Sequence, residues 1–468
     1  MVELRGYKHT SEEMDKGGDT AGEPPRADLE VFYQRLKDRS ARIGVIGLGY
    51  VGLPLGQAIC AAGFHVLGFD VDEAKIDQLK RGRSYIALIP DESLSRLVGC
   101  GQLQATSDFA RLTEVDAILI CVPTPLSRHR EPDLKFIIHT TESIAPHLRP
   151  GHLIVLESTT YPGTVREVIR PILERTGLKS GFDFFLAYSS ERADPGNTDF
   201  ITSSIPKVVG GDGPHALKLA CALYDQFVTA TVPVSSLETA EAVKLTENIF
   251  RSVNIALVNE LKIIYSAMGI DIWEVIEAAK TKPFGFMPFY PGPGLGGHCI
   301  PIDPFYLTGK AREFKLTTRF IELAGEINTN MPKYVVDRLA EALDQRFAKG
   351  LNGAKVLVLG VAYKKNVEDM RESPALAIME LLEARGVEVS YYDPFIPEIP
   401  PTRDHAALAD RRSVVWSPEV LSSFDAAMIV TDHDDVDYAK LVLHSRLVVD
   451  TRNATRAVSM HRDKIVKA

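Results

Sequence analysis

The sequence predicts an α/β protein in which two doubly wound parallel sheets are joined by a long central helix and a helical connector. Short apolar runs rich in β-branched residues alternate with helical stretches over 41–232 and again over 351–468, which is typical of parallel sheets covered by helices. Over 233–350 a helical period replaces this alternation. A polar tail, which we expect to be disordered up to about residue 25, and one short helix make up 1–40. At 468 residues the chain is too long for one core. We therefore expect four segments, at 1–40, 41–232, 233–350 and 351–468.

The elements of the two halves follow from apolar runs and helical periods taken in order. In the first half we expect strands at 42–48, 66–70, 117–122, 153–157 and 184–188, with helices over 29–39 and 54–62. The alternation predicts a parallel sheet that continues to about residue 230. In the second half we expect strands at 355–360, 387–392, 425–430 and 447–450.

The central segment is dominated by one long helix. Its period runs from Glu238 to Met268 almost without a breaker, and Gly269 is a natural C-cap. More helix follows to about residue 348, interrupted by a Pro/Gly-rich stretch over 288–304. A helix this long between two α/β halves predicts a dimer surface, so we expect a homodimer or a higher homo-oligomer.

Composition excludes several classes of protein. The net charge of -9 argues against a nucleic-acid binder, which would carry a basic surplus. No apolar run approaches the roughly 20 residues of a membrane span, and the first 26 residues lack the apolar stretch of a signal peptide. The five cysteines form no CxxC pair or regular spacing, which favours a reducing cytoplasm over a disulfide framework. We assign no metal-binding residue.

A dinucleotide-binding loop is predicted at Gly47–Gly52, which reads G-x-G-x-x-G between a strand and a helix. Gly47 permits the tight turn, Gly49 lets the backbone approach a pyrophosphate, and Gly52 lets helix and strand pack closely. About twenty residues on, Asp70 ends the second strand, where its carboxylate accepts from a ribose hydroxyl and repels a 2′-phosphate. The pattern therefore predicts a Rossmann-like domain that binds NAD rather than NADP. The alternative is the same fold without a nucleotide.

The second half imitates this loop only in part, because Gly360 is not followed by the other two glycines. A second dinucleotide site is therefore not expected in this second Rossmann-like domain. Lys364 and Arg371 are cations that are suited to meet phosphate, or else a solvated surface pair.

A catalytic cysteine is predicted at Cys299. The stretch 291–299 is dense in glycine, and because glycine costs backbone entropy, such a loop usually brings its backbone close to something. A thiolate attacks carbonyl carbon readily, and a thioester is a sensible intermediate between aldehyde and acid. Asp303 follows four residues later. The alternative is a structural cysteine, and His298 receives no role.

Other polar residues have spacings that suit a site. Lys244 and Asn248 are four apart on the long helix, so they share a face and are placed to meet one oxygen, or else both face solvent. Glu191 and Thr124 each follow a predicted strand, at the end of the sheet where α/β proteins bind ligands.

Taken together, these segments resemble the UDP-glucose/GDP-mannose dehydrogenase family over roughly 41–460. The motifs that carry the resemblance are Gly47–Gly52, Val122–Pro125, Ser158–Thr164, Ser190–Arg192, Lys244 with Asn248, Gly296–Cys299 with Asp303, and Arg371–Pro374. The resemblance implies NAD-dependent oxidation of a UDP-sugar from primary alcohol to carboxylate. A non-catalytic nucleotide-sugar-binding protein is the alternative from another class, and the intact Cys299, Lys244, Asn248 and Asp303 argue against it.

The resemblance also implies a role for each matching residue. Cys299 would be the nucleophile, Lys244 and Asn248 would stabilise oxyanions, and Glu191 would activate the hydrolytic water. Thr124 and Asp303 would position water and assist proton transfer. Cofactor contacts would come from Gly47, Gly49, Tyr50, Val51, Gly52, Asp70, Lys75, Thr124, Thr160 and Arg371, and substrate contacts from Phe289, Tyr290, Gly296, Lys364 and Arg452. One departure is Pro195, where some members carry a second carboxylate, which puts a two-carboxylate water mechanism in doubt.

The substrate suggested by this resemblance is UDP-N-acetylglucosamine. The stretch 290–307 is most similar to members that oxidise this sugar at C6 for bacterial surface polysaccharides. UDP-glucose and other UDP-N-acetylhexosamines are the alternatives. We expect Phe289 and Tyr290 to form the wall beside the acetamido group.

Overall fold

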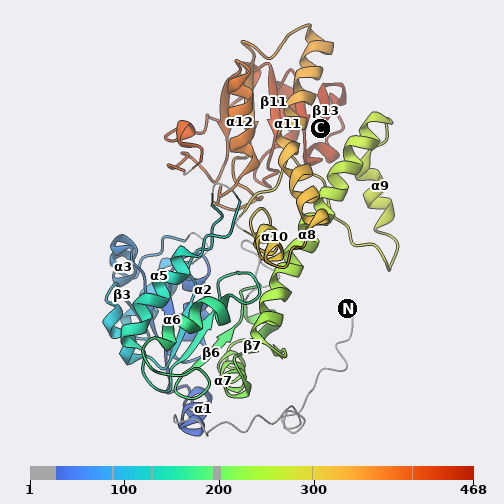
Figure 1. Cartoon of the computed structure of the whole chain (residues 1–468). Helices are drawn as coiled ribbons and strands as arrows, with labels where there is room; N and C mark the ends of the chain where they lie inside the picture. The colour runs from blue at the N-terminus through green and yellow to red at the C-terminus, as the bar shows by residue number, and fades with distance from the viewer. Residues whose placement is uncertain (1–27, 87–88, 128–129, 193–201, 298, 403) are drawn as a thin grey trace.

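The computed structural model has an α/β unit at each end and long helices between them (Figure 1). It describes residues 28–86, 89–127, 130–192, 202–297, 299–402 and 404–468. Helix α8 (Leu237–Ala267) leaves the N-terminal unit, and α11 (Arg319–Phe347) packs along it and leads into the C-terminal unit. The predicted class, two Rossmann-like units joined by a long central helix, is confirmed. The expectation for the first 25 residues lies outside the described residues.

The N-terminal sheet has eight strands in the order β3-β2-β1-β4-β5-β6-β7-β8. They are β1 (Arg42–Ile46), β2 (His65–Phe69), β3 (Leu103–Thr106), β4 (Ala117–Ile120), β5 (Leu153–Leu156), β6 (Phe185–Tyr188), β7 (Lys207–Gly211) and β8 (Thr231–Pro233). The first six follow the dinucleotide-binding order. The predicted parallel sheet is confirmed except at one pairing, because β7 runs antiparallel to β6 through two residue pairs. Apolar alternation does not encode strand direction, so the sequence could not reveal this.

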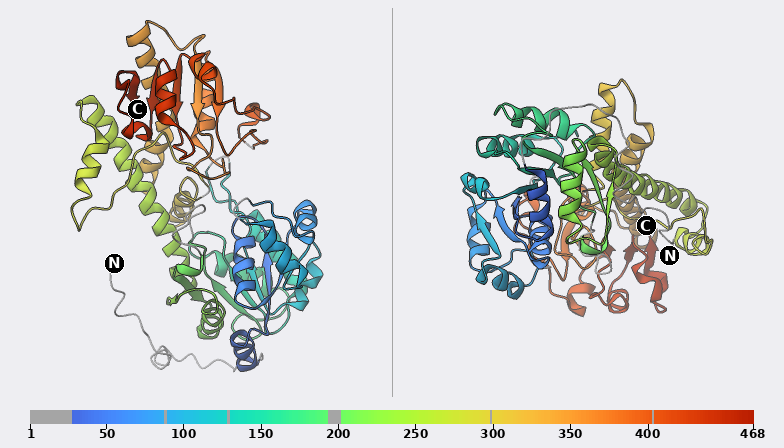
Figure 2. Two further views of the ribbon diagram at one scale, coloured as in Figure 1. Left: turned by 180° about the vertical axis from the view of Figure 1, so that it is seen from behind. Right: turned by 90° about the horizontal axis from the view of Figure 1, so that it is seen from below.

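Helices cover both faces of this sheet (Figure 2). They are α1 (Leu29–Lys37), α2 (Gly52–Ala61), α3 (Glu73–Lys80), α4 (Asp91–Gly99), α5 (Lys135–Ile144), α6 (Arg170–Glu174) and α7 (Pro214–Tyr224). Leu36, Ile59 and Leu223 belong to a core on one face, formed with α1, α2 and α7. Ile137 and Leu237 belong to the core on the other face, where α5 and the start of α8 lie. Because the strands are buried on both faces, they read as nearly continuous apolar runs.

The central helices agree closely with the sequence prediction. Helix α8 begins after Ser236, whose Oγ accepts the Thr239 N–H at 3.1 Å. It ends at Ala267, and Gly269, two residues later, has a φ of 73°. It is followed by α9 (Ile272–Ala279), α10 (Asp303–Glu313) and α11. Buried amides join the two long helices, since Asn259 donates to Asn328 Oδ1 at 2.9 Å. Helices α8 and α11 therefore run between the two α/β units and carry polar side chains into the space between the two sheets.

The C-terminal sheet has five parallel strands in the order β10-β9-β11-β12-β13, the other common doubly wound order. They are β9 (Lys355–Leu359), β10 (Glu388–Tyr392), β11 (Ala426–Ile429), β12 (Val448–Asp450) and β13 (Ile465–Lys467), with helices α12 (Pro374–Ala384), α13 (Pro418–Ser422) and α14 (Tyr438–His444). Four strands were predicted, and β13 was missed because a half-exposed edge strand of three residues carries little pattern.

Short turns of other helical types complete the described elements. They are η2 (Phe109–Glu114), η3 (Ala145–His147), η4 (Val165–Ile169), η5 (Thr202–Ser204), η6 (Ala406–Leu408), η7 (Ala454–Ala457) and η8 (Arg462–Lys464). Among the described residues, no helix combines the length and the apolar character that crossing a membrane requires.

Candidate functional site

The glycine loop between β1 and α2 has the geometry of a pyrophosphate cradle. Gly47 has a φ of 88°, and a Cβ there would lie 2.8 Å from the Cys121 carbonyl oxygen. A Cβ on Gly52 would overlap the carbonyl oxygen of Gly47, at far less than the 3.0 Å that real Cβ atoms keep. By contrast, a Cβ on Gly49 would meet no described heavy atom within 4 Å. Gly47 and Gly52 are therefore required by the protein itself, whereas the space at Gly49 remains for a ligand.

The helix that follows this loop leaves its N-terminus to a ligand. Val51 occupies the N-cap of α2 and makes no side-chain capping hydrogen bond. The N–H groups of a first helical turn, together with the helix dipole, attract phosphate. The residues at this turn therefore fit a dinucleotide pyrophosphate.

Asp70 lies at the carboxyl end of β2 beside the glycine loop. Its Oδ2 accepts the Leu48 N–H at 2.9 Å, and its Oδ1 accepts the Asp72 N–H at 3.0 Å. The ammonium of Lys75 lies 3.6 Å from the same Oδ2. These contacts fix the carboxylate next to the loop, in the position from which an acidic residue accepts a ribose hydroxyl.

The loops after β4 and β5 bring two threonines to the same edge of the sheet. Thr124 is buried, and its hydroxyl is hydrogen-bonded to Tyr306 of α10. Thr160 is fully buried, and its Oγ1 has no hydrogen-bond partner among the described residues. Ser158 donates to the Val122 carbonyl at 2.7 Å and holds the two loops together. An unpaired buried hydroxyl at a strand end is available to a ligand.

A polar cluster forms where α8 meets the start of α10. Lys244 and Asn248 are 8% and 1% exposed, so the alternative that they face solvent is excluded. Lys244 Nζ donates to the Glu191 carbonyl at 2.5 Å, and Asn248 Nδ2 donates to Asp303 Oδ2 at 2.5 Å. Asp303 opens α10, and its N–H donates to the Cys299 carbonyl at 2.8 Å. The structure thus brings these five residues together, two of them (Glu191 and Cys299) through their backbone carbonyls.

Burial governs the electrostatics of this cluster. It raises the pKa of Asp303 to about 7, although the Lys244 ammonium, the Asn248 amide and Arg251 act in the opposite direction. Burial and then the Asp303 carboxylate raise the pKa of the Cys299 thiol, opposed by Lys244 and Arg251. Because the thiol keeps its proton, attack by sulfur requires a nearby proton acceptor. The buried Asp303 Oδ1 has no hydrogen-bond partner among the described atoms, so it has room to accept a proton.

Glu191 lies three residues after the end of β6, and its carbonyl accepts the hydrogen bond from Lys244. Its Oε1 accepts the Arg192 N–H at 2.8 Å, and its Oε2 lies 4.0 Å from the ammonium of Lys207. Pro195, where the family pattern suggests a second carboxylate, lies outside the described residues.

The glycines before Cys299 pack against the C-terminal unit. A Cβ on Gly296 would lie 2.7 Å from Tyr363 Cβ, and a Cβ on Gly297 would lie 2.8 Å from the ring of the same tyrosine. The Gly297 N–H donates to the Arg371 carbonyl at 2.9 Å. A Cβ on Gly292 would overlap the guanidinium of Arg452. The close approach that the sequence predicted is therefore made, and its partner is the segment 363–374 together with Arg452.

The loop after β9 differs from the cofactor loop in a way that excludes a second dinucleotide cradle. Asp393 Oδ2 accepts the N–H groups of Val361 and Ala362 at 2.7 and 3.0 Å, so these donors are already used. Lys364 is half-buried in the same loop. Arg452 follows β12, and its Nε donates to the Val430 carbonyl at 3.0 Å. The two cations therefore stand at the carboxyl ends of the C-terminal strands.

Arg371 reaches from the C-terminal half to the cofactor loop. Its guanidinium lies 4.6 Å from the centre of the Tyr50 ring, and its Nη2 donates to Asp369 Oδ2 at 2.7 Å. Held in this way, the cation stands beside the expected pyrophosphate position while it belongs to the other half of the chain.

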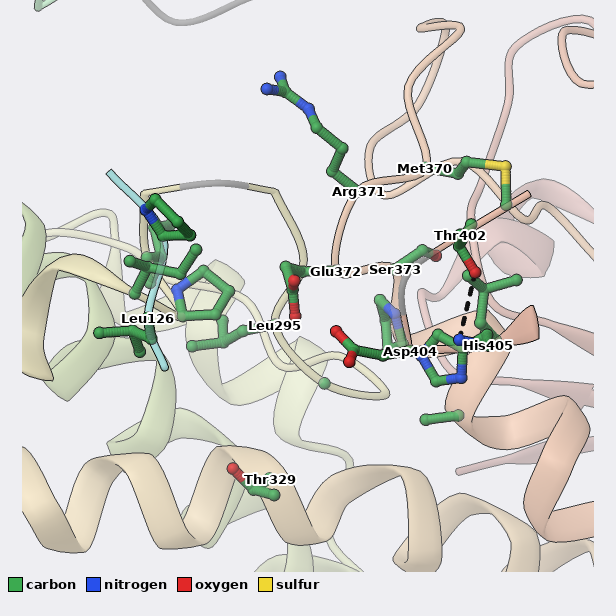
Figure 3. Close-up of a pocket in the computed structure, with 18 of the residues that line it drawn as sticks. Leu126, Leu295, Thr329, Met370, Arg371, Glu372, Ser373, Thr402, Asp404 and His405 are labelled. Carbon is green, nitrogen blue, oxygen red and sulfur yellow. Dashed lines mark hydrogen bonds between the residues drawn. The ribbon is translucent and has the colours of Figure 1, made fainter. Parts of the chain in front are cut away.

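A cavity of about 1160 Å³ opens between the two α/β units. Tyr50 of the cofactor loop and Arg371 line it, as do Leu295 and Ile300 from the two sides of Cys299. Figure 3 shows Leu126 and Leu295 on one side and the segment Met370–Ser373 on the other, with Thr329 of α11 below them. The cavity is large enough for a nucleotide-sized ligand.

Phe289 and Tyr290 are not brought into the cysteine cluster. Tyr290 stacks on Trp273 of α9 at 5.6 Å between ring centres, and its hydroxyl donates to Glu277 at 2.9 Å. Phe289 packs edge-on against Phe250 at 5.7 Å. Both rings therefore lie on the α9 side of the central segment.

Sequence reasoning missed several residues near the site. Arg251 donates to Asn248 Oδ1, and its spacing of three from Asn248 on the same helix was an available signal. Lys207, Glu157 and Tyr224 form a buried cluster behind Glu191, but they are separated by 17 to 67 residues. A single lysine inside an apolar strand gives no indication of such partners.

Fold and site together define a class of protein. A dinucleotide-dependent dehydrogenase has a glycine loop at the end of β1 and an acidic residue at the end of β2. This chain has both, together with a cysteine near a lysine, an amide and two acidic residues. Sequence models of the UDP-glucose/GDP-mannose dehydrogenase family match its NAD binding domain at residues 41–228, its central domain at 238–330 and its UDP binding domain at 357–457. The chain belongs to this family, and it is an NAD-dependent dehydrogenase of UDP-sugars.

Individual relatives span most of the chain. The UDP-N-acetyl-D-glucosamine 6-dehydrogenase of Pseudomonas aeruginosa is 38% identical over 76% of this chain and 84% of its own length. The UDP-N-acetyl-D-mannosamine dehydrogenase of Pyrococcus horikoshii is 35% identical over 88% and 95%. A solved structure of the UDP-D-ManNAc dehydrogenase from Pyrococcus horikoshii covers 88% of this chain and 96% of that one, with a TM-score of 0.79 and 34% identity.

Proposed function

We propose that the protein oxidises the C6 hydroxyl of UDP-N-acetylglucosamine to a carboxylate in two NAD-dependent steps, through a thioester on Cys299. The observation that carries this proposal is the cluster of Cys299, Asp303, Asn248 and Lys244. The residues on both sides of Cys299 line the same cavity as Tyr50 of the cofactor loop. A thiol can add to an aldehyde carbon when a proton acceptor lies next to it, and two N–H donors can stabilise the oxyanion that forms. This arrangement is suited to an aldehyde that stays bound for a second oxidation. The UDP binding domain and the similarity to the Pseudomonas enzyme support the substrate.

In the first oxidation, the chain's own residues remove a proton and hold the oxygen. Asp303, together with Thr124 and a water between them, accepts the proton of the C6 hydroxyl. Lys244 and Asn248 present N–H groups to the oxygen as negative charge develops on it. NAD, when bound at the cofactor loop, would supply the hydride acceptor for each of the two oxidations. Lys364 and Arg452 hold the diphosphate of the substrate, and Arg371 faces the cofactor pyrophosphate.

In the second oxidation and the hydrolysis, Cys299 carries the substrate. Asp303 first releases the proton of the first oxidation to solvent. The Cys299 sulfur then adds to the aldehyde carbon while the thiol proton passes to Asp303, and loss of a second hydride from that carbon leaves a thioester. Glu191 then takes a proton from water, the water oxygen attacks the thioester carbon, and the C–S bond breaks with Cys299 leaving as thiolate. One alcohol and one water thus give one carboxylate, with four electrons removed.

The nearest alternative substrate is UDP-N-acetylmannosamine, because dehydrogenases of that sugar from Pyrococcus horikoshii and Salmonella typhi are 35% and 33% identical to this chain. A panel of UDP-N-acetylglucosamine, UDP-N-acetylmannosamine and UDP-glucose, followed by NADH formation, tests the proposal. The expected result is the highest kcat/KM with UDP-N-acetylglucosamine, at least about tenfold above UDP-glucose, which corresponds to about 1.4 kcal/mol. Higher kcat/KM with either rival sugar would overturn the substrate assignment.

We also propose that the protein is a homodimer through α8. Phe250, Leu257 and Ile264 are 47%, 50% and 47% exposed, and their spacing of seven places them on one face of that helix. Three large apolar side chains in one exposed stripe are suited to a second copy of the same surface.

A further inference from the structure

A buried lysine lies behind Glu191 and takes no part in the proposed oxidation steps. Lys207 on β7 is 3% exposed, and its Nζ donates to Glu157 Oε2 at 2.7 Å and to the Ser190 carbonyl at 3.3 Å. The same ammonium lies 4.0 Å from Glu191 Oε2. Tyr224 donates its hydroxyl to the other oxygen of Glu157, and its ring centre lies 5.1 Å from Lys207 Nζ. One buried cation thus faces two carboxylates.

Burial and charge act in opposite directions on the buried lysine and on its closest carboxylate. Burial favours the neutral form of Lys207, yet Glu157 and then Glu191 outweigh this and raise the pKa of the ammonium above its ordinary value. Burial in turn raises the pKa of Glu157, and Lys207 opposes that shift. Removing the cation would leave two carboxylates close together without compensation, which is costly in a buried site.

The backbone around Glu191 is held by two lysines from different elements. Lys207 donates to the carbonyl of Ser190, and Lys244 donates to the carbonyl of Glu191 itself. Lys244 belongs to the cluster that contains Asn248 and Asp303. Among the described residues, Lys207 contacts Glu157, Ser190, Glu191 and Tyr224. Its contacts therefore reach Glu191 and not Cys299.

We propose that Lys207 is a positioning residue for hydrolysis of the thioester, which fixes the Ser190–Glu191 turn and holds the Glu191 carboxylate oriented toward the attacking water. This inference rests on the proposed function, because it needs a thioester on Cys299. Loss of Lys207 is expected to slow the step that requires Glu191 as a base. The two oxidations, which use Asp303, Lys244 and Asn248, are expected to proceed.

The test is the Lys207→Met variant of the full chain, with UDP-N-acetylglucosamine and excess NAD in a stopped-flow fluorimeter. The expected trace is a burst of two NADH per active site, followed by steady-state turnover at least tenfold slower than in the unmodified enzyme. Acid-quenched protein is expected to carry the sugar on Cys299 by mass spectrometry. Hydroxylamine, a nucleophile that needs no base, is expected to restore turnover to within threefold and to release a hydroxamate.

Two further variants control for folding. Lys207→Met combined with Glu157→Gln removes the cation and one of its two carboxylates, so that no uncompensated pair remains. This double variant is expected to show the same burst and the same adduct, even if the single variant does not fold. Lys310→Met removes another buried lysine that pairs with two carboxylates, Glu167 and Glu313, and is expected to show no adduct.

The proposal is overturned if the burst and the steady-state rate fall together, if neither changes, or if hydroxylamine restores nothing. It is also overturned if Lys310→Met accumulates the same adduct. Failure of the proposed function looks different, since the unmodified enzyme would then yield no thioester at all and Cys299→Ala would still turn over.

Discussion

Two glycines of the cofactor loop make a matched pair for a quantitative test. Gly49→Ala adds a methyl group where no described heavy atom lies within 4 Å, and the φ of Gly49 lies outside the left-handed region. Gly52→Ala adds the same methyl group where it would overlap the carbonyl oxygen of Gly47 and lie 3.2 Å from Cys121 Cβ. The first change is therefore compatible with the folded protein alone, and the second is not.

The magnitudes follow from these surroundings. Overpacking a site costs about 1–3 kcal/mol, and for Gly52→Ala we expect the upper end because the obstacle is backbone that cannot rotate away. At about 2–4 °C per kcal/mol for a unit of this size, the apparent Tm falls by roughly 6–12 °C. For Gly49→Ala we expect a Tm within about 2 °C of the unmodified protein, since the methyl group meets open space.

The cofactor affinity separates the two further. If a pyrophosphate approaches Gly49, the added methyl group displaces it, and the Kd for NAD rises at least about tenfold, or 1.4 kcal/mol. Thermal melts with and without NAD, together with NAD titration by calorimetry, measure both quantities. The reasoning is refuted if Gly49→Ala binds NAD normally, or if Gly52→Ala melts at the unmodified temperature.

Three other changes have defined outcomes. The pKa of Asp303 is raised to about 7, and a protonated carboxyl cannot accept a proton. We therefore expect kcat to fall about tenfold per pH unit below pH 7. Asp303→Asn should lower kcat and remove this acidic limb from the pH profile. Asp70→Ala should narrow the preference for NAD over NADP in kcat/KM, whereas equal use of both cofactors by the unmodified enzyme would contradict the role of Asp70. Leu257→Glu should convert a dimer into a monomer by light scattering, and a monomer without the substitution would contradict the α8 interface.

Much of the fold was predictable because its signals are local in sequence. The strands β1, β2 and β4 and the helix α8 were predicted to within two residues, since each is bounded by a glycine or polar turn and has a clear period. The direction of β7 was not predictable, because an apolar run fits a parallel and an antiparallel partner equally well. The three-residue β13 was missed for lack of pattern.

The candidate site divides in the same way. Lys244 and Asn248 share a face because four residues make about one helical turn, and Asp303 lies near Cys299 because four residues separate them. The cluster of Lys207, Glu157 and Tyr224 depends on three segments that meet only after folding. The role of Tyr290 beside the sugar stays a prediction, and its ring packs against Trp273 of α9. The local sequence predicted the glycine-rich loop before Cys299, but it could not predict that the Tyr290 ring packs toward α9.

The central claim is a four-electron oxidation through a thioester on Cys299, and the yield of NADH per sugar tests it most directly. With a limiting, weighed amount of UDP-N-acetylglucosamine and excess NAD, the account predicts two NADH per sugar at the end point and a product carboxylate by mass spectrometry. Cys299→Ala should not reach this end point. One NADH per sugar with release of an aldehyde, or two NADH per sugar at the unmodified rate in Cys299→Ala, would contradict the account.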